Sequence, residues 1–196
     1  MSLAKQAKTL SREQAAAVLA YLTTKQPDRN RLIFLLSIRA GLRAKEIANL
    51  TWSMVCKSDG TMATDIALSN QASKGRRGGR HIPLCKELRT ALEVWHATLR
   101  RPDPSSRVIT TSRSNATSAQ VIVNLFRSWY SRLGFQGCSS HSGRRTFITN
   151  VARKISTVGG SLRDVQALAG HSALSTTQRY IEINSEAKRK IVELVG

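Results

Sequence analysis

One segment of the chain, from about residue 52 to residue 84, differs in pattern from the sequence on either side of it. Short apolar runs are broken there by Asp59-Gly60 and by a cluster of glycines between residues 75 and 79, which is typical of a small antiparallel sheet. The last strand is expected at residues 81–84. Elsewhere the apolar residues recur at helical spacing. The pattern therefore predicts a mostly α domain with a small antiparallel β-sheet, an α+β fold.

Three helices are expected before this segment. Ser11-Arg12-Glu13-Gln14 has the spacing of a capping box, and the apolar residues after it predict a helix from about 12 to 24. Asp28 is expected to cap a second helix, which is apolar on nearly every side and ends near Gly41. A short third helix should cover about 43–49.

After the sheet, helical spacing returns and continues to the C-terminus. The expected helices cover about 88–99, 118–133, a stretch from 141, 161–169, a short piece around Tyr180, and 185–194. A length of 196 residues suits one ordinary domain. We therefore expect a single domain over 1–196, with 185–196 as a C-terminal helical tail.

The charge of the chain indicates its class of partner. Lysine and arginine number 31 against 12 acidic residues, a formal net charge of +19, which attracts polyanions. Double-stranded DNA is the leading expectation; a solvated basic surface and an anionic membrane are the alternatives. No apolar run approaches the roughly 18 residues of a membrane span. The first residues lack the apolar core of a secretory signal, so a cytoplasmic location is expected.

Neither the cysteines nor the carboxylates suggest a metal. Cys56, Cys85 and Cys138 are odd in number and far apart, which argues against a disulfide framework and against a zinc site. No clustered carboxylates of the kind that hold magnesium are evident, so metal-dependent nuclease chemistry is disfavoured. No cofactor is expected.

The helix that begins near His141 carries polar residues on its apolar face. At about 100° per residue, His141 and Arg144 fall on the same stripe as Ile148 and Ile155. A buried guanidinium needs a partner. That partner is either an internal carboxylate or a phosphate bound at the first turn, where free N–H groups favour anions.

Other candidate residues each allow a structural and a functional interpretation. Arg43 could fork onto a phosphate while Glu46 orients it, or the two could form an ordinary surface pair. The glycine-rich turn from Ser73 to Arg80 could approach DNA or be a solvated hairpin. His171 follows the helix-stopping Gly170, and a lone histidine there is commonly a C-capping residue. A lone tyrosine such as Tyr180 is commonly half-buried in packing contacts.

Taken together and in order, these motifs resemble the active site of the tyrosine recombinase (phage integrase) family, over about residues 8 to 196. The likeness rests on Ala40-Gly41-Leu42-Arg43-Ala44-Lys45-Glu46-Ile47-Ala48-Asn49-Leu50, Lys74, His141-Ser142-Gly143-Arg144, Gly170-His171 and Tyr180.

The resemblance implies that Tyr180 is the nucleophile and forms a 3′-phosphotyrosyl link to DNA. Arg43 and Arg144 would grip the non-bridging oxygens of the phosphate and stabilise the transition state. The residue chemistry agrees, because a phenol with a pKa of about 10 is a poor nucleophile at neutral pH unless cations or a base favour its phenolate.

The same resemblance assigns the remaining roles. Lys74 would protonate the departing 5′ oxygen. His141 would accept the proton of Tyr180 or bind the phosphate, and His171 would hydrogen-bond a phosphate oxygen. Glu46 would stand behind this cluster and orient it. Independently of the resemblance, four further arginines are expected to contact DNA: Arg76, Arg77, Arg80 and Arg145.

The sequence departs from the family pattern in places. Gly143 and Ala169 stand where leucine is usual, and the helical core-binding domain that family members usually carry in front is not expected in this chain. The resemblance implies a site-specific recombinase that works as a tetramer on DNA, and a monomer is expected when the protein is free. A type IB topoisomerase-like activity and a non-catalytic DNA-binding regulator remain as alternatives. The tail could dock on a neighbouring protomer or pack on its own chain.

Overall fold

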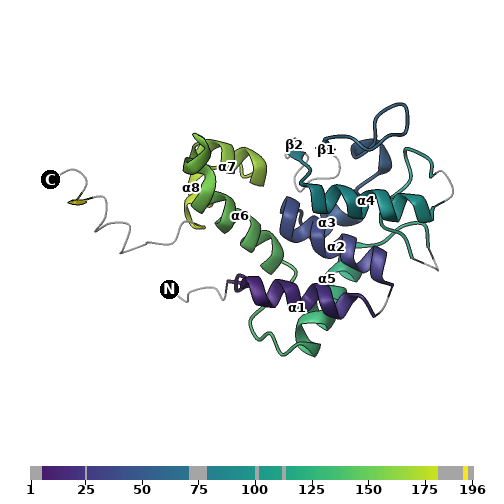
Figure 1. The fold of residues 1–196 in the computed structure, drawn as a ribbon, viewed down its shortest axis with the longest axis horizontal. Helices are drawn as coiled ribbons and strands as arrows, with labels where there is room; N and C mark the ends of the chain where they lie inside the picture. Colours follow the sequence, from purple (N-terminus) through teal and green to yellow (C-terminus); the bar gives the residue numbers. More distant parts are fainter. Residues whose placement is uncertain are drawn as a thin grey trace.

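The computed structural model describes residues 6–24, 26–70, 79–99, 102–111, 114–180 and 192–193. Helices make up most of it, and a two-stranded sheet lies at one edge (Figure 1). The expected α+β class is confirmed. Within these residues no helix is both long and apolar enough to cross a membrane.

The N-terminal helices follow local sequence signals, with one correction. Helix α1 (Arg12–Leu22) begins with the expected capping box on Ser11. Helix α2 (Pro27–Ala40) is capped by Gln26, whose φ of 44° is left-handed, and not by Asp28, which lies in the first turn. Proline is favoured at the first helical position because the N–H that it lacks would have no partner there. This preference moves the helix start ahead of Asp28.

Gly41 ends α2 in the left-handed conformation, with φ 64°, as its position in the sequence predicts. A short helix, α3 (Ala44–Asn49), follows at once, with Arg43 as its N-cap residue. The backbone thus turns sharply between two helices, and the turn consists of Gly41, Leu42 and Arg43.

The sheet consists of β1 (Asp65–Leu68) and β2 (Arg80–Pro83), after a short 3₁₀ turn η1 (Trp52–Met54). The strands are antiparallel, with Ile66 opposite Ile82 and both side chains buried. This pair fixes which face of the hairpin meets the core. The glycine-rich residues 71–78 between the strands lie outside the described part of the chain.

The C-terminal half is helical. Its elements are α4 (Lys86–Thr98), α5 (Ala119–Arg132), α6 (Ser142–Lys154), the 3₁₀ turn η3 (Ile155–Val158), α7 (Leu162–Ala169) and α8 (Leu174–Gln178). Tyr180 lies in the turn after α8, whereas the sequence pattern placed it within a helix. The expected helix at 185–194 falls almost wholly outside the described residues.

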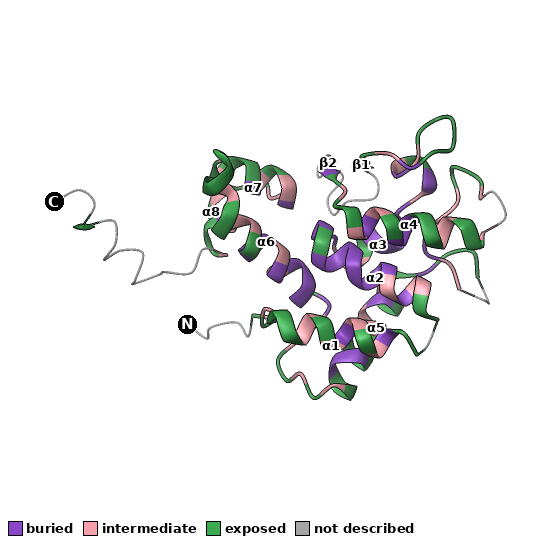
Figure 2. Cartoon of the chain, viewed as in Figure 1, coloured by how far each residue is buried: buried purple, intermediate pink, exposed green. Residues whose placement is uncertain are grey.

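The core has two parts that meet at α6. A large cluster surrounds α2, which is buried along most of its length (Figure 2). A small cluster of Ile148, Val165 and Ala169 joins α6 to α7, with the ring of Tyr180 packed against it. In Figure 2 the burial of α6 is greatest at the end that meets α2. Helix α6 therefore connects the main core to the segment that leads to Tyr180.

Candidate active site

Arg144 is buried between the ends of two other helices. Its guanidinium, in a residue only 3% exposed, donates to the carbonyl of Gly41 at 2.5 Å and to the carbonyl of Ala169 at 2.6 Å. These carbonyls lie at the C-terminal ends of α2 and α7, where helices carry unpaired acceptors and partial negative charge. The buried guanidinium of Arg144 is therefore partnered by carbonyls at helix ends and not by an internal carboxylate.

Burial, and next the positive charge of Arg43, lower the pKa of Arg144 below its usual value, while the nearby Glu46 opposes them. A guanidinium nevertheless stays protonated near neutral pH. Arg144 is thus a fixed cation that carbonyl dipoles hold in place, and no carboxylate in the described part of the chain is bonded directly to it. Such a cation suits an anionic group such as a phosphate.

Arg43 and Glu46 are neighbours, but their pair is not a surface pair. The side chain of Glu46 is fully buried, and its carboxylate accepts from Arg43 Nη1 at 2.8 Å and from the Arg43 backbone N–H at 2.8 Å. Arg80 donates to both carboxylate oxygens, at 3.0 and 3.1 Å. Burial raises the pKa of Glu46, but the hydrogen bonds and charges of Arg80 and Arg43 outweigh it, so the pKa lies below its ordinary value.

Arg80 was expected to contact DNA or to be solvated, and the structure places its side chain inside the protein, away from solvent. The Arg80 side chain is only 6% exposed, and its Nε donates to the carbonyl of Leu168 at 2.9 Å. The guanidinium is turned inward because the buried carboxylate of Glu46 lies there. Arg80 therefore belongs to the ion cluster and not to the outer surface.

His171 and Tyr180 stack on each other. Their ring centroids are 5.4 Å apart at an interplanar angle of 23°, and His171 Nδ1 lies 3.0 Å from the hydroxyl of the buried Thr177. Burial, followed by the charges of Arg144, Arg43 and Arg80, lowers the pKa of His171 to about 4. The ring is therefore neutral at physiological pH, so one nitrogen can donate while the other accepts.

A cavity of about 350 Å³ opens beside the ring of Tyr180. The guanidinium of Arg145 lies 5.9 Å from the centroid of that ring. The lining includes the exposed His141, buried Arg144 and Arg179. Cations thus surround the tyrosine on the open side, while His171 covers its ring.

The structure brings most of the predicted site together. Contacts link Arg43 to Glu46 and His171 to Tyr180, and one cavity joins His141, Arg144 and Tyr180. Lys74, Arg76 and Arg77 lie outside the described residues, so their roles stay predictions. The sequence interpretation missed Thr177, Arg179 and Gln6, which touch His171 or line the cavity. Proximity to Tyr180 in sequence was the available signal for Thr177 and Arg179.

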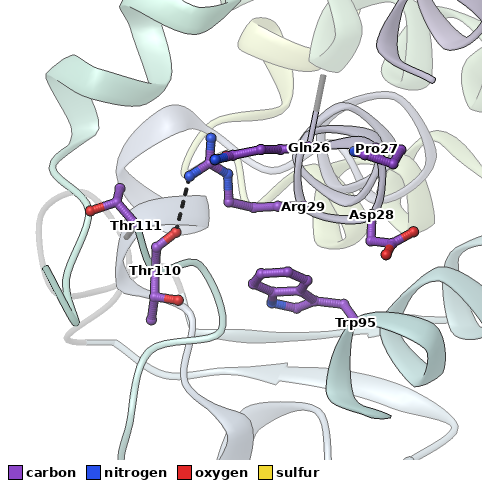
Figure 3. Close-up of a pocket in the computed structure, with 7 residues that line it drawn as sticks. All are labelled: Gln26, Pro27, Asp28, Arg29, Trp95, Thr110 and Thr111. Atoms are coloured by element: carbon purple, nitrogen blue, oxygen red, sulfur yellow. Dashed lines mark hydrogen bonds between the residues drawn. The ribbon is translucent and has the colours of Figure 1, made fainter. Parts of the chain in front are cut away.

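A second cavity, of about 370 Å³, lies between the start of α2 and Trp95 of α4 (Figure 3). Arg29 donates to the carbonyl of Thr110 there, at 3.4 Å. None of its lining residues is among the predicted site residues. In the described part of the chain, no group of three His, Cys, Asp or Glu side chains is placed to hold a metal ion.

Comparison with solved structures places this fold. The crystal structure of XerA recombinase matches with a TM-score of 0.73 at 22% identity, over 96% of this chain and 65% of that one. The Tn1549 transposon integrase, in complex with circular intermediate DNA, matches with a TM-score of 0.73 at 18% identity, over 96% of this chain and 67% of that one. At these identities the likeness concerns the fold.

Sequence comparison extends the likeness to relatives. Tyrosine recombinase XerA of Thermococcus onnurineus (strain NA1) is 31% identical over 191 residues, which are 95% of this chain and 62% of that protein. XerC of Proteus mirabilis is 28% identical over 167 residues, 84% of this chain and 51% of the relative. The chain thus spans between half and two thirds of these relatives. A model of the phage integrase family matches residues 8–187, nearly the whole chain, and with the fold and the order of the motifs this match shows that the chain belongs to the phage integrase family.

Proposed function

We propose that this chain is the catalytic part of a site-specific DNA recombinase that cuts and rejoins strands through a 3′-phosphotyrosyl link. Its family and its relatives, which are named tyrosine recombinases, support the proposal. So do the solved structures of similar fold, some of which are complexes with DNA, such as XerH bound to its difH substrate. The net charge of +19 fits a polyanionic substrate.

The observation that carries the proposal is the surrounding of Tyr180. Its ring stacks on neutral His171, lies near Arg145 and faces a cavity that it shares with Arg144. A phosphate in that cavity would meet a fixed guanidinium and a tyrosine at once. Cations around a phenol favour its phenolate, which is the form that attacks phosphorus.

In the proposed step, the phenolic oxygen of Tyr180 forms a bond to phosphorus as the bond from phosphorus to the 5′ oxygen breaks. His141 accepts the tyrosine proton, and Lys74 gives a proton to the departing 5′ oxygen. Arg43 and Arg144 neutralise the charge that grows on the non-bridging oxygens. Rejoining reverses the step, as a 5′-hydroxyl attacks the phosphotyrosine and releases Tyr180. One phosphoester bond replaces another, so the chemistry needs no cofactor.

The assembly follows from the reaction. Exchange between two duplexes requires four cuts, so four copies on DNA are the proposed working form, with a monomer in the absence of DNA. The alternative activity, relaxation of one duplex, needs no pairing of sites. We also propose that the tail after Tyr180 docks on a neighbouring copy in this assembly.

The test is to lyse expressing cells in detergent and to sequence the DNA ends that are covalently attached to the protein. We expect 3′-linked ends from the wild type and from Tyr21→Phe, which removes a phenol hydroxyl elsewhere, but none from Tyr180→Phe. Adducts that persist in Tyr180→Phe would exclude Tyr180 as the nucleophile. If the wild type gives no covalent ends, and nicked trapping substrates built from genomic DNA also yield no adduct, a DNA-binding regulator is the better description.

A further inference from the structure

Arg80 lies where three segments of the fold meet. It is the first residue of β2, and its side chain reaches across to α3 and to the end of α7. The guanidinium donates to both oxygens of Glu46, while Nε donates to the carbonyl of Leu168. Its side chain is only 6% exposed, so these groups are enclosed by protein.

The contact with α7 is adjacent to the one that Arg144 makes. Arg80 holds the carbonyl of Leu168 and Arg144 holds the carbonyl of Ala169, so two arginines fix consecutive peptides at the end of the helix. The next residue, Gly170, has φ 61°, and a Cβ added to it would lie 2.8 Å from Arg80 Nη1. The backbone that leads into His171 therefore lies directly on the Arg80 guanidinium.

We propose that Arg80 is a positioning residue of the active site, which ties Glu46 and its partner Arg43 to the turn that carries His171, without contacting DNA itself. This inference rests on the proposed function for its catalytic consequence. Its structural part, the placement of His171, stands independently of DNA chemistry.

The shape of the side chain matters as much as its charge. A guanidinium presents several N–H groups in one plane, and here they bridge a carboxylate and a carbonyl from different segments. A lysine ammonium is a point charge and cannot span both in the same way. Arg80→Lys therefore keeps the charge but removes the bridge, whereas Arg80→Gln removes both.

Arg89 is the matched control on the surface. It also pairs with a glutamate, Glu93 at 3.1 Å, and lies 3.4 Å from a carbonyl, that of Met62. Its side chain is 43% exposed, and neither Glu93 nor Met62 belongs to the site. Arg89→Gln makes the same chemical change as Arg80→Gln, so it shows what the loss of an Arg–Glu pair does in itself.

The first measurement needs no DNA. The chain has four histidines, so the ring resonances of His171 can be assigned with His171→Gln and followed through a pH titration by NMR. The ring pKa is expected to be near 4 in the wild type, because of burial and the charges of Arg144, Arg43 and Arg80. We expect Arg80→Gln to raise this pKa, and Arg80→Lys to displace the His171 resonances even though the charge is kept. Arg89→Gln should match the wild type.

Either of two outcomes overturns the inference. The first is a folded Arg80→Gln whose His171 titrates as in the wild type. The second is an Arg80→Lys with wild-type His171 resonances, which would reduce the role of Arg80 to charge alone. Should both variants fail to fold, the wild type still decides: a slowly exchanging Arg80 Nε–H supports the bridge, and fast exchange contradicts it.

The second measurement tests the catalytic consequence. Its substrate is a nicked duplex with the sequence of the DNA ends found covalently attached to the wild type. We expect the single-turnover rate of adduct formation at saturating DNA to fall on the order of 100-fold in Arg80→Gln, as misplaced catalytic groups do. The DNA dissociation constant should change less than about twofold, because Arg80 makes no phosphate contact. An equal loss in rate and affinity would refute the positioning role. Wild type without adduct would refute the proposed function, and the NMR result would still decide the placement of His171.

Discussion

A glycine in the first turn of α6 sets how closely this helix can approach α2. A Cβ added to Gly143 would lie 2.5 Å from Ser37 Oγ, 3.1 Å from Ser37 Cβ and 3.4 Å from the Ile38 nitrogen. Ser37 is fully buried, and its hydroxyl has no hydrogen-bond partner among the described residues. We therefore expect Gly143→Ala to strain this contact, although alanine is the better helix former.

The magnitude follows from two opposing effects. Overpacking a tight contact costs roughly 1–3 kcal/mol. Replacing a helical glycine with alanine returns up to about 1 kcal/mol. The free energy of unfolding should therefore fall by about 1 kcal/mol in Gly143→Ala. Leucine, which is usual at this position in the family, would need more room still.

Ser37→Ala completes a double-mutant cycle with Gly143→Ala. It removes the Ser37 hydroxyl, whose oxygen makes the 2.5 Å clash and has no hydrogen-bond partner among the described residues. Loss of such a group is close to neutral or stabilising. In the double variant the 2.5 Å clash is gone and the 3.1 Å contact remains, so most of the cost should be relieved. The double variant should therefore be more stable, by about 1 kcal/mol, than the sum of the two single effects predicts.

The assay is urea unfolding of the wild type, the two single variants and the double variant, with midpoints compared at constant m value. Gly143→Ala should also slow the proposed reaction of Tyr180, because Arg144 is the next residue and its two carbonyl contacts depend on the position of α6. The reasoning is refuted if Gly143→Ala is as stable as the wild type, or if Ser37→Ala fails to reduce its cost.

Two further outcomes are expected. Glu46→Gln should lower the free energy of unfolding at pH 7 by on the order of 3 kcal/mol, since it leaves buried cations without a carboxylate. The pKa of Glu46 is lowered in the folded protein, so the wild type should lose this extra stability as the pH falls from about 4.3, the unfolded value, through the folded value. If Glu46→Gln were less stable than the wild type by the same amount at pH 7 and at pH 3, the carboxylate would not stabilise the fold through its charge. Thr177→Val should disturb His171 and slow adduct formation, whereas Thr177→Ser, which keeps the hydroxyl 3.0 Å from Nδ1, should not; equal rates in the two variants would exclude the hydroxyl as the cause.

Local sequence signals were sufficient to predict where several helices begin or end. The capping box on Ser11 and the left-handed glycines Gly41 and Gly170 are local signals, and each lies where the structure ends or begins a helix. Asp28 failed as a cap because Pro27, one residue earlier, had the stronger preference. These features depend on hydrogen bonds within a few residues, so a linear pattern is sufficient to predict them.

The order of the motifs also indicated which residues share the site, since it matched a family pattern, but the sequence left their partners open. The bond from Arg144 to Gly41 spans 103 residues, that from Arg80 to Leu168 spans 88, and that from Arg80 to Glu46 spans 34. Whether an arginine faces solvent, DNA or a buried carboxylate depends on how α2, α6 and α7 pack. That Arg80 turns inward could not be predicted from the sequence, because a guanidinium binds the nearest unsatisfied acceptors, and those acceptors come together only when distant segments pack.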